Sequence, residues 1–501
     1  MSGPVGAEDH VGIYVINVIG GTIRKLRDDA RRAAVSPDGS RILFVTGHPA
    51  QVMVMTADGE QAHTIVPGVE GDGIQLPSWS PDGQRILFLR IRRAAQDPDF
   101  ILESRDANGG TPVTLLSNPN LRYFLWLPGN RLVYSLQEDS PHREDMNLWE
   151  LSLDSRSGAP RGKPHKITDW SGFVFERLSA TADGKRLIFV NDHDQGDVYI
   201  GELEKSGKQI KTPVRLTLSD RNDWPGGWTA DSKSILFYSN RSGNFDLYRQ
   251  KVAERSAEAI GTAQEEKRTP QMSPDGQWIV YISWPRMPHE AQASSGHLMR
   301  IPVSGGPAEP LFEVKGYATW GWPGDVMRNL GDVPGFHCPS SSKASCVLAE
   351  PDEKNKRIVF TPFDPAQGKK GQPVSVQSSE DSTWALSPDG SRIAITFFDT
   401  KAATIRIVPL DGATPHDIAV KGATELVSVG WAADGNSLFT IRNSSKGGIL
   451  LHVDLSGESQ VLTRAAWDAF LPTASPDGRF LAFGAVNSNS NVWTIPSLPK
   501  P

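Results

Sequence analysis

Short apolar runs separated by polar turns recur along the whole chain, and they predict strands. Typical runs cover three or four residues, as at 42–45, 187–190 and 481–483. Runs of this length, bounded by turn residues, fit buried strands. Residues 246–249 alternate polar and apolar side chains instead, which is the pattern of a strand with one buried face. The pattern therefore predicts an all-β protein.

One turn sequence, Ser-Pro-Asp-Gly, separates these strands at regular intervals. Pro presets φ near −65°, Asp accepts hydrogen bonds from nearby backbone N–H groups, and Gly tolerates positive φ, so the tetrapeptide predicts the turn of a β-hairpin. An aromatic residue often precedes it and an apolar run follows it. Five copies begin at Ser36, Ser80, Ser273, Ser387 and Ser475, and four looser copies begin at Leu127, Thr181, Thr229 and Ala432.

The spacing of these copies gives the size of the repeat. Successive copies begin 43 to 54 residues apart, except for one gap of 114 residues between Ser273 and Ser387. That gap holds about two periods, so we expect a tenth, unmarked repeat inside it. Each period fits four short antiparallel strands, which is the blade of a β-propeller.

Ten blades exceed the four to eight of a single propeller. We expect two packed propellers, residues 1–256 and 257–501, and one large propeller is the alternative. The chain begins with what looks like the third and fourth strands of a blade, and its last repeat lacks a fourth strand. We therefore expect an N-terminal strand within residues 12–26 to pair with the final blade, residues 480–496, and to close a ring.

Charge and hydropathy narrow the choice of partners. Lys and Arg number 52 against 58 Asp and Glu, the formal net charge is −6, and no basic stripe alternates with aromatic residues. We therefore expect no nucleic-acid partner. No apolar run approaches the roughly 18 residues that span a bilayer. Residues 11–18 are apolar but follow two acids, Glu8 and Asp9, so they predict a strand and not a signal peptide.

The two cysteines, Cys338 and Cys346, stand eight positions apart. Two ligands cannot complete a four-coordinate zinc site, and the eleven histidines show no metal-binding spacing, so we expect neither a metal nor a cofactor. A disulfide that closes a β-hairpin fits the spacing, and two free thiols are the alternative. A disulfide would imply an oxidising compartment.

The unit Trp-Ser-Pro-Asp-Gly-x-x-Ile-x-Phe, followed by a turn and an Ile-Tyr-Val-like strand, resembles the TolB-like (WD40-like) propeller repeat. This resemblance covers nearly the whole chain, and it implies a fold more than a function. Five stretches also look like the propeller sensor regions that follow a transmembrane helix in some bacterial serine/threonine kinases, which implies a location outside the cytoplasm. These stretches are residues 147–150, 178–186, 215–225, 301–306 and 346–350.

Catalytic motifs are missing from the sequence. It has no kinase Gly-rich loop, His-Arg-Asp or Asp-Phe-Gly, and no Gly-x-Ser-x-Gly of an α/β-hydrolase. We therefore expect no enzymatic activity, and a kinase or membrane segment would be a partner or lie elsewhere; a propeller hydrolase or lyase with an unrecognised channel site is an alternative. Residues 191–197 superficially resemble a calcium loop, but they lack the distal Glu and predict a hairpin turn.

Loops that join the outer strand of one blade to the inner strand of the next gather on one face of a propeller. Three such loops carry a Trp beside an acid, a combination that can bind a sugar, a peptide or a cation. The alternative is that these residues cap the blades. The candidate ligand-binding residues are Trp170, Arg221, Asp223, Trp224, Trp467 and Asp468, with Trp320 and Trp322 as a weaker ledge.

The sequence thus predicts a non-catalytic propeller that binds a protein, a peptide or a cell-wall-derived ligand. We expect it outside the cytoplasm, in the periplasm, as the sensor region of a signalling system; a cytoplasmic location is the alternative. The resemblance to TolB implies a second possibility, an assembly scaffold of the cell envelope.

Overall fold

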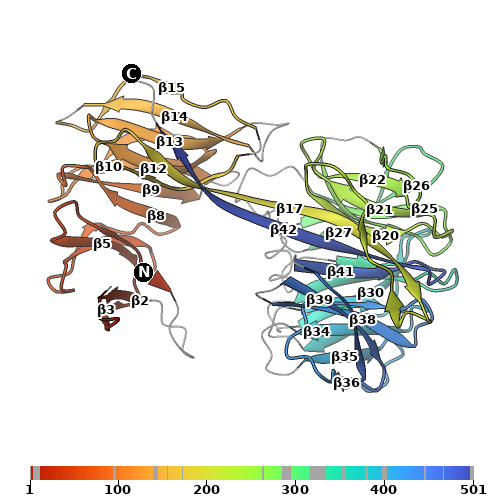
Figure 1. Ribbon diagram of the computed structural model, residues 1–501. Helices are drawn as coiled ribbons and strands as arrows, with labels where there is room; N and C mark the ends of the chain where they lie inside the picture. Colours follow the sequence, from red (N-terminus) through yellow and green to blue (C-terminus); the bar gives the residue numbers. More distant parts are fainter. Residues whose placement is uncertain are drawn as a thin grey trace. The chain divides into compact units, whose positions relative to one another are not determined.

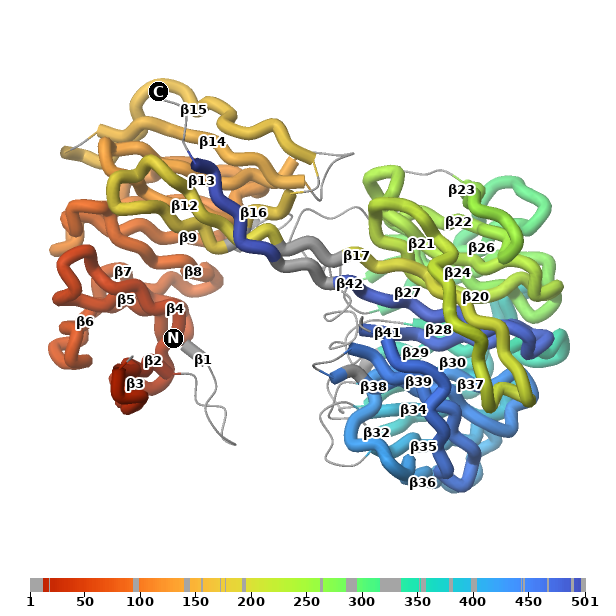
Figure 2. The backbone as a smooth tube through the Cα atoms, viewed as in Figure 1, coloured from red at the N-terminus to blue at the C-terminus, as the bar shows by residue number. Residues whose placement is uncertain are grey.

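The computed structural model consists of β-strands, β1 to β42 in chain order, which form ten sheets among the described residues (Figure 1; Figure 2). No helix with the length and hydropathy of a membrane span occurs among these residues. The structure describes residues 2–3, 12–17, 19–93, 98–138, 145–154, 156–171, 173–261, 265–284, 295–315, 335–352, 357–377, 382–397, 403–444, 447–465 and 468–496.

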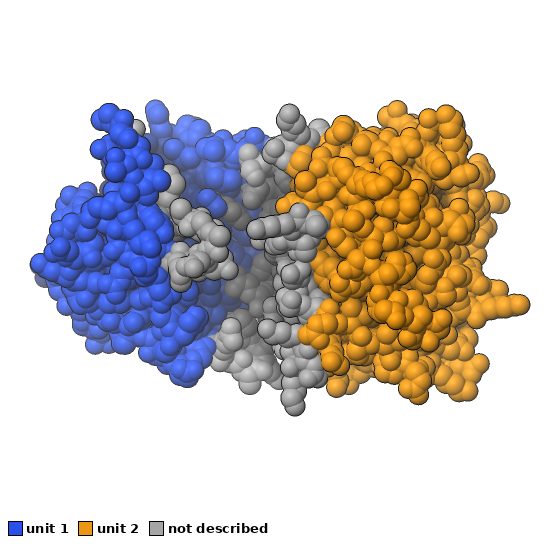
Figure 3. All heavy atoms as spheres, turned by 90° about the horizontal axis from the view of Figure 1, so that it is seen from below, with its two compact units in different colours: residues 1–193, 489–501 blue, residues 194–488 orange. Residues whose placement is uncertain are grey.

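The chain divides into two compact units, which are coloured separately in Figure 3. Unit 1 comprises residues 1–193 and 489–501. Its sheets are antiparallel, and each full blade follows the chain order from the inner to the outer strand. The strands are β1 (Ser2–Gly3), β2 (Gly12–Ile16) and β3 (Ile23–Asp28); β4 (Arg31–Val35), β5 (Arg41–Thr46), β6 (Gln51–Thr56) and β7 (His63–Val66); β8 (Asp72–Trp79), β9 (Arg85–Arg93), β10 (Pro98–Asp106) and β11 (Val113–Ser117); β12 (Leu121–Leu127), β13 (Arg131–Gln137), β14 (Met146–Leu153) and β15 (Pro160–Lys166); and β16 (Phe175–Ala180) with parts of β17 (Leu187–Glu204) and β42 (Phe480–Ile495).

Unit 2 comprises residues 194–488 and holds six blades. Its strands are β18 (Gln209–Ile210) and β19 (Val214–Arg215); β20 (Asp223–Trp228), β21 (Ser234–Ser239), β22 (Asp246–Lys251) and β23 (Glu258–Ala259); β24 (Glu266–Met272), β25 (Trp278–Trp284), β26 (Ser295–Pro302) and β27 (Glu309–Lys315); β28 (Gly335–His337), β29 (Cys346–Asp352), β30 (Arg357–Asp364), β31 (Lys369–Lys370) and β32 (Val374–Gln377); β33 (Ser382–Leu386), β34 (Arg392–Phe397), β35 (Thr404–Pro409) and β36 (His416–Ala419); β37 (Ser428–Trp431), β38 (Ser437–Ser444), β39 (Gly447–Asp454) and β40 (Ser459–Arg464); and β41 (Asp468–Ala474) with parts of β17 and β42.

The six blades of unit 2 form a closed ring. The inner strands β41, β20, β24 and β28 contact one another in that order, and so do β33, β37 and β41. Phe360 of β30 packs against Trp384 of β33, with the ring centroids 5.1 Å apart, and this contact joins the remaining pair of blades. Apolar side chains fill the spaces between the sheets: Ile405 on one blade and Leu438 on the next belong to a single buried cluster and are both 0% exposed. The predicted all-β propeller of four-stranded blades is confirmed.

The recurring turns are built as the sequence predicts. In the last copy the Ser475 hydroxyl donates a hydrogen bond to the Asp477 carboxylate at 2.6 Å, and Gly478 has a φ of 70°. The fourth residue has positive φ in all nine copies, including Asn130 and Ser232, which replace Gly in the looser copies. Each turn therefore joins the inner strand of its blade to the second strand.

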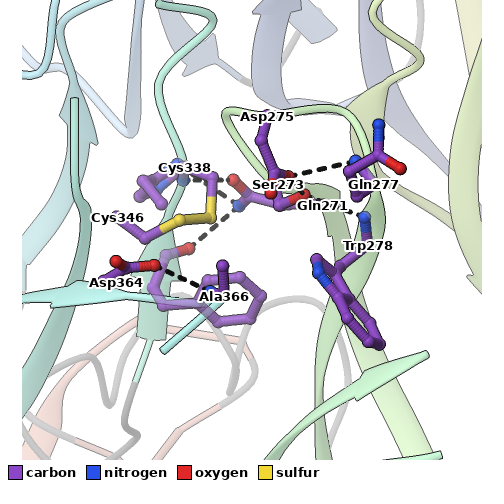
Figure 4. Close-up of a disulfide and its surroundings, with 11 residues drawn as sticks. Gln271, Ser273, Asp275, Gln277, Trp278, Cys338, Cys346, Asp364 and Ala366 are labelled. Carbon is purple, nitrogen blue, oxygen red and sulfur yellow. Dashed lines mark hydrogen bonds between the residues drawn. A yellow bond between two sulfur atoms is a disulfide. The ribbon is translucent and has the colours of Figure 1, made fainter. Parts of the chain in front are cut away.

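The tenth repeat is the sheet from β28 to β32, and it carries the disulfide (Figure 4). Cys338 follows β28 and Cys346 begins β29, so the Cys338–Cys346 bond spans the turn that Ser-Pro-Asp-Gly forms in other blades. Gln271 of the preceding blade fixes this turn: its amide nitrogen donates to the Phe336 carbonyl at 2.9 Å, and its amide oxygen accepts from the Cys338 backbone at 2.8 Å. The predicted disulfide is present.

Two long strands, β17 (Leu187–Glu204) and β42 (Phe480–Ile495), lie next to each other in one sheet (Figure 2). Each runs from one unit into the other, because the division falls at residues 193/194 and 488/489. Residues 191–197 lie inside β17, so the predicted hairpin turn there is wrong. A turn is unnecessary at this point because the first half of β17 pairs with β16 in unit 1 and the second half pairs with β18 and β19 in unit 2.

The division also differs from the boundary expected at residues 256/257. Unit 2 begins at residue 194 and lies between two segments of unit 1. The expected pairing of residues 12–26 with the final blade is not found. Strand β2 pairs with β1 and β3, whereas the described neighbours of β42 are β17 and β41. The repeat period locates blades, but it does not show which strands leave a blade and enter another unit.

Candidate functional site

Trp170, the first candidate, belongs to an aromatic cluster of unit 1. Its ring centroid lies 5.0 Å from that of Phe173 and 5.8 Å from that of Phe175. Its backbone N–H donates to the side-chain oxygen of Asn147 at 2.8 Å, and its side chain is 37% exposed. Because Trp170 lies in unit 1, whereas the other candidates belong to unit 2, the six residues are not shown to form one site.

Three predicted residues, Trp320, Trp322 and Trp467, lie outside the described residues. Asp468 begins β41, an inner strand of unit 2, and burial raises the pKa of its carboxyl above the ordinary value. Asp223 begins β20, the inner strand of an adjacent blade that contacts β41. The structure therefore brings Asp468 and Asp223 to the same end of neighbouring inner strands.

Asp223 and Trp224 are adjacent in sequence but have different surroundings. The Asp223 carboxylate is fully buried, accepts a hydrogen bond from the Ser219 hydroxyl at 2.8 Å, and forms an ion pair with Arg241 at 2.7 Å. The Trp224 ring is 7% exposed and lies in an apolar cluster with Phe470 of β41. Trp224 therefore packs between blades and presents little of its ring to a ligand.

A second ion pair lies in the neighbouring blade. The Asp197 carboxylate of β17 contacts the Arg215 guanidinium at 2.7 Å, and Asp197 is 5% exposed. Burial raises the pKa of Asp197 to about 7; the nearby Asp223 carboxylate acts in the same direction, and Arg215 opposes the rise. The Gln195 amide donates to the Ser219 carbonyl at 2.7 Å, which links this pair to the loop that holds Asp223.

The series of charges continues into the next blade. The Lys267 ammonium, near the start of β24, donates to the buried Asp246 carboxylate at the start of β22. In an antiparallel blade the first and third strands begin at the end where the second and fourth strands finish, so these groups share one end. We call this end of three successive blades the charged end of unit 2; its residues are Asp197, Arg215, Asp223, Arg241, Asp246 and Lys267.

The arrangement of these charges can bind an anion. The three carboxylates are buried and each is paired with a cation, whereas the Arg215 and Arg241 side chains keep 33% and 24% of their surface exposed. Partly exposed guanidinium groups above buried acids present hydrogen-bond donors to an anionic ligand. Among the residues described, no group of three His, Cys, Asp or Glu side chains is arranged to hold a metal ion.

Sequence reasoning found Asp223 but missed the pairs around it. A usable signal is the repeated start of the third strand, Asp-Val-Tyr at Asp197 and Asp-Leu-Tyr at Asp246. A recurring acid at the same place in successive blades indicates a recurring cationic partner. These partners are Arg215 on β19 for Asp197 and Lys267 on β24 for Asp246, and only the fold brings them to these acids.

Fold and repeat define the class: this is a β-propeller protein. Residues 15–97 match the family model of the lipoprotein LpqB β-propeller domain. The uncharacterized protein Atu1656 of Agrobacterium fabrum is 28% identical over 326 residues, which cover 64% of this chain and 83% of that protein. These matches support the prediction of a TolB-like propeller protein, whereas the likeness to kinase sensor regions stays a prediction.

Solved propeller structures are similar at low sequence identity. A TolB structure from Agrobacterium tumefaciens is 18% identical, covers 61% of this chain and 90% of its own, and has a TM-score of 0.26. TolB from Acinetobacter baumannii is 16% identical, with coverage of 70% and 79% and a TM-score of 0.26. The β-propeller domain of the Trilobed protease from Pyrococcus furiosus is 14% identical, with coverage of 60% and 87% and a TM-score of 0.28.

Proposed function

We propose that this protein is a non-catalytic binding scaffold outside the cytoplasm, and that the charged end of unit 2 recognises an acidic segment of a protein partner. The observation that carries the proposal is the pair of partly exposed guanidinium groups, Arg215 and Arg241, each anchored on a buried carboxylate. The anchoring limits their side-chain motion, so binding an anion costs little further conformational entropy.

The proposed location rests on two independent supports. The Cys338–Cys346 disulfide fits an oxidising compartment, where such bonds persist. The family model that matches residues 15–97 is named for a lipoprotein, and the solved propellers include two TolB structures. A role in sensing or signalling is the finer form of the same proposal, with the partner as its signal.

Binding of a fluorescein-labelled hexa-glutamate peptide, measured by fluorescence anisotropy at low salt, tests the charged end. The informative variant is the double substitution Asp223→Asn with Arg241→Gln, because it removes the cation without leaving a buried carboxylate unpaired. We expect the peptide to bind the wild-type protein and to bind the double variant at least about fivefold more weakly, which corresponds to about 1 kcal/mol.

The matched control is Arg255→Gln, which removes one exposed arginine in the turn between β22 and β23, at the opposite end of the same unit. This control should bind the peptide as the wild-type protein does, and all variants should keep their thermal unfolding temperature within a few degrees. Equal affinity of the wild-type protein and the double variant would contradict the proposed site. A partner pulled from an envelope extract by the wild-type protein and lost with the double variant would support it.

A further inference from the structure

The sheet that joins the two units has an incomplete blade in unit 1. β16, the first half of β17 and the second half of β42 occupy the positions of the first, second and third strands. The other three sheets of unit 1 that begin with an inner strand, β4 to β7, β8 to β11 and β12 to β15, have four strands each. Among the described residues, no strand pairs with the outer edge of β42 beyond Val486.

The third strand of this blade exposes apolar side chains. Val492 is 76% exposed and Trp493 is 44% exposed, although the Trp493 ring contacts Phe173 at 5.2 Å between centroids. The corresponding pairs in complete blades are more buried: Val198 is 0% exposed, and Leu247 and Tyr248 are 0% and 7% exposed. An exposed, uncharged strand edge of this kind is a template for pairing with another strand.

Complete blades show how a fourth strand pairs with this position. The residues that correspond to Trp493 each pair with a residue of the fourth strand: Trp149 with Lys166, and Tyr199 with Arg215. The residue before each aromatic, which corresponds to Val492, turns its backbone carbonyl outward. The carbonyl of Leu148 accepts from the Ile167 N–H at 2.7 Å, and that of Val198 from the Leu216 N–H at 2.8 Å.

The same two blades also define the chemistry of the incoming strand. A threonine follows the apolar residue in both, and its hydroxyl accepts the outward-facing N–H of the third strand. The Leu148 N–H donates to Thr168 at 2.9 Å, and the Val198 N–H donates to Thr217 at 3.0 Å. In these two blades the fourth strand is therefore a basic residue, an aliphatic residue and a threonine. The blade of Leu247 and Tyr248 keeps only the aliphatic residue, Ile260, whose N–H donates to the Leu247 carbonyl at 2.8 Å.

From this repeated geometry we infer that the outer edge of β42 at Val492 binds an extended segment of another polypeptide, which adds as the fourth strand of the blade through a basic–aliphatic–threonine sequence. This is strand addition, in which backbone hydrogen bonds provide affinity and alternate side chains provide specificity. The site is in unit 1 and is separate from the charged end of unit 2.

The sequence argues against a segment of this chain as the occupant. Its two basic–aliphatic–threonine segments of this kind, at Lys166 and Arg215, are already paired within their own blades. Residues 496–501 carry three prolines and no threonine, and proline cannot donate to a strand ladder. An extended segment of a partner therefore fits the edge best.

A synthetic peptide with the sequence of residues 213–219, Pro-Val-Arg-Leu-Thr-Leu-Ser, tests the inference. Labelled with fluorescein and titrated with the full-length protein, it should bind with a micromolar dissociation constant. The same peptide N-methylated at its first leucine cannot donate to the Val492 carbonyl and should bind about tenfold more weakly.

The matched protein variant is Val492→Pro, which removes the outward-facing N–H, with Val492→Thr as the control that keeps it. Proline is tolerated where an edge N–H faces solvent, so both variants should retain the far-ultraviolet circular dichroism of the wild-type protein. We expect Val492→Thr to bind the peptide normally and Val492→Pro to bind it about tenfold more weakly. Loss of the fold in Val492→Pro moves the test to the N-methylated peptide.

Two results would overturn the inference. One is equal binding of the two peptides by the wild-type protein, because the backbone of the bound segment would then play no part. The other is a dimer of the wild-type protein, seen by sedimentation velocity, that dissociates in Val492→Pro, because the edge would then serve a second copy of this chain.

Discussion

The guanidinium carbon of Arg392 lies 4.7 Å from the centroid of the Trp431 ring in the next blade. The same guanidinium donates to the Gly435 carbonyl at 2.9 Å, within the turn that follows Trp431. Unit 1 repeats the arrangement, since Arg41 lies 4.7 Å from the Trp79 ring. The arginine that follows the turn of one blade therefore contacts both the tryptophan and the turn of the next blade.

We expect Arg392→Gln to lower the free energy of unfolding by about 1 to 2 kcal/mol, because it removes a cation–π contact and a hydrogen bond between blades. Urea unfolding followed by circular dichroism measures the change. Arg464→Gln, at an exposed position, should change it by less than about 0.5 kcal/mol. Equal changes in the free energy of unfolding for the two substitutions would show that Arg392 does not stabilise the contact between blades.

Reduction of the Cys338–Cys346 bond should destabilise unit 2. The bond joins two cysteines that are eight positions apart in sequence. It lowers the conformational entropy of the unfolded chain, which raises the free energy of unfolding by about 2 to 3 kcal/mol. We expect the double variant Cys338→Ala with Cys346→Ala to unfold at a lower temperature by calorimetry and to be insensitive to added reductant. A wild-type protein that unfolds at the same temperature with and without reductant would contradict this expectation.

Asp197 should make stability depend on pH. Its folded pKa of about 7 is above the ordinary value of 3.8, so the folded state holds its proton more tightly than the unfolded state does. The stability contributed by this proton is complete below about pH 4 and is lost as the pH rises through 7.

We therefore expect the free energy of unfolding to fall between pH 4 and pH 7, with about 2 to 4 kcal/mol of the change due to Asp197. Asp197→Asn cannot titrate and should flatten this part of the curve, measured by urea unfolding at several pH values. Parallel curves for the variant and the wild-type protein would show that Asp197 does not titrate in this range.

The two candidate tryptophans should respond differently to truncation. Trp224→Ala leaves a cavity between blades and should cost about 3 to 5 kcal/mol. Trp170→Ala removes a partly exposed ring and should cost about 1 kcal/mol. Thermal unfolding measures both, and a Trp224→Ala protein as stable as Trp170→Ala would contradict the buried position of Trp224.

The sequence predicts the blades well because each signal is local. The Ser-Pro-Asp-Gly turns specify their own φ values, as at Gly478, and the apolar runs beside them are long enough for one strand. Even the unmarked repeat was predictable from the gap between Ser273 and Ser387, and the two cysteines lie at its turn.

The crossing of β17 and β42 could not be predicted in this way. Residues 191–197 are polar and contain Gly196, so their composition is that of a turn. They form a strand because partners distant in sequence pair on both sides, and Gly196 leaves space for the Trp224 ring, which would lie 2.5 Å from a Cβ atom there. The charged end could not be predicted for the same reason, because Arg215 and Arg241 contact Asp197 and Asp223 only in the folded unit.

The continuous strands β17 and β42 also determine how the chain responds to cleavage. Two covalent connections link the units, one at residues 193/194 and one at 488/489. A cut at 488/489 leaves both units on one chain, residues 1–488. A cut at 193/194 gives two chains, 1–193 and 194–501, which then stay together only through the sheet that β16, β17 and β42 form. Release of unit 2 as a separate fragment requires two cuts, one in each strand.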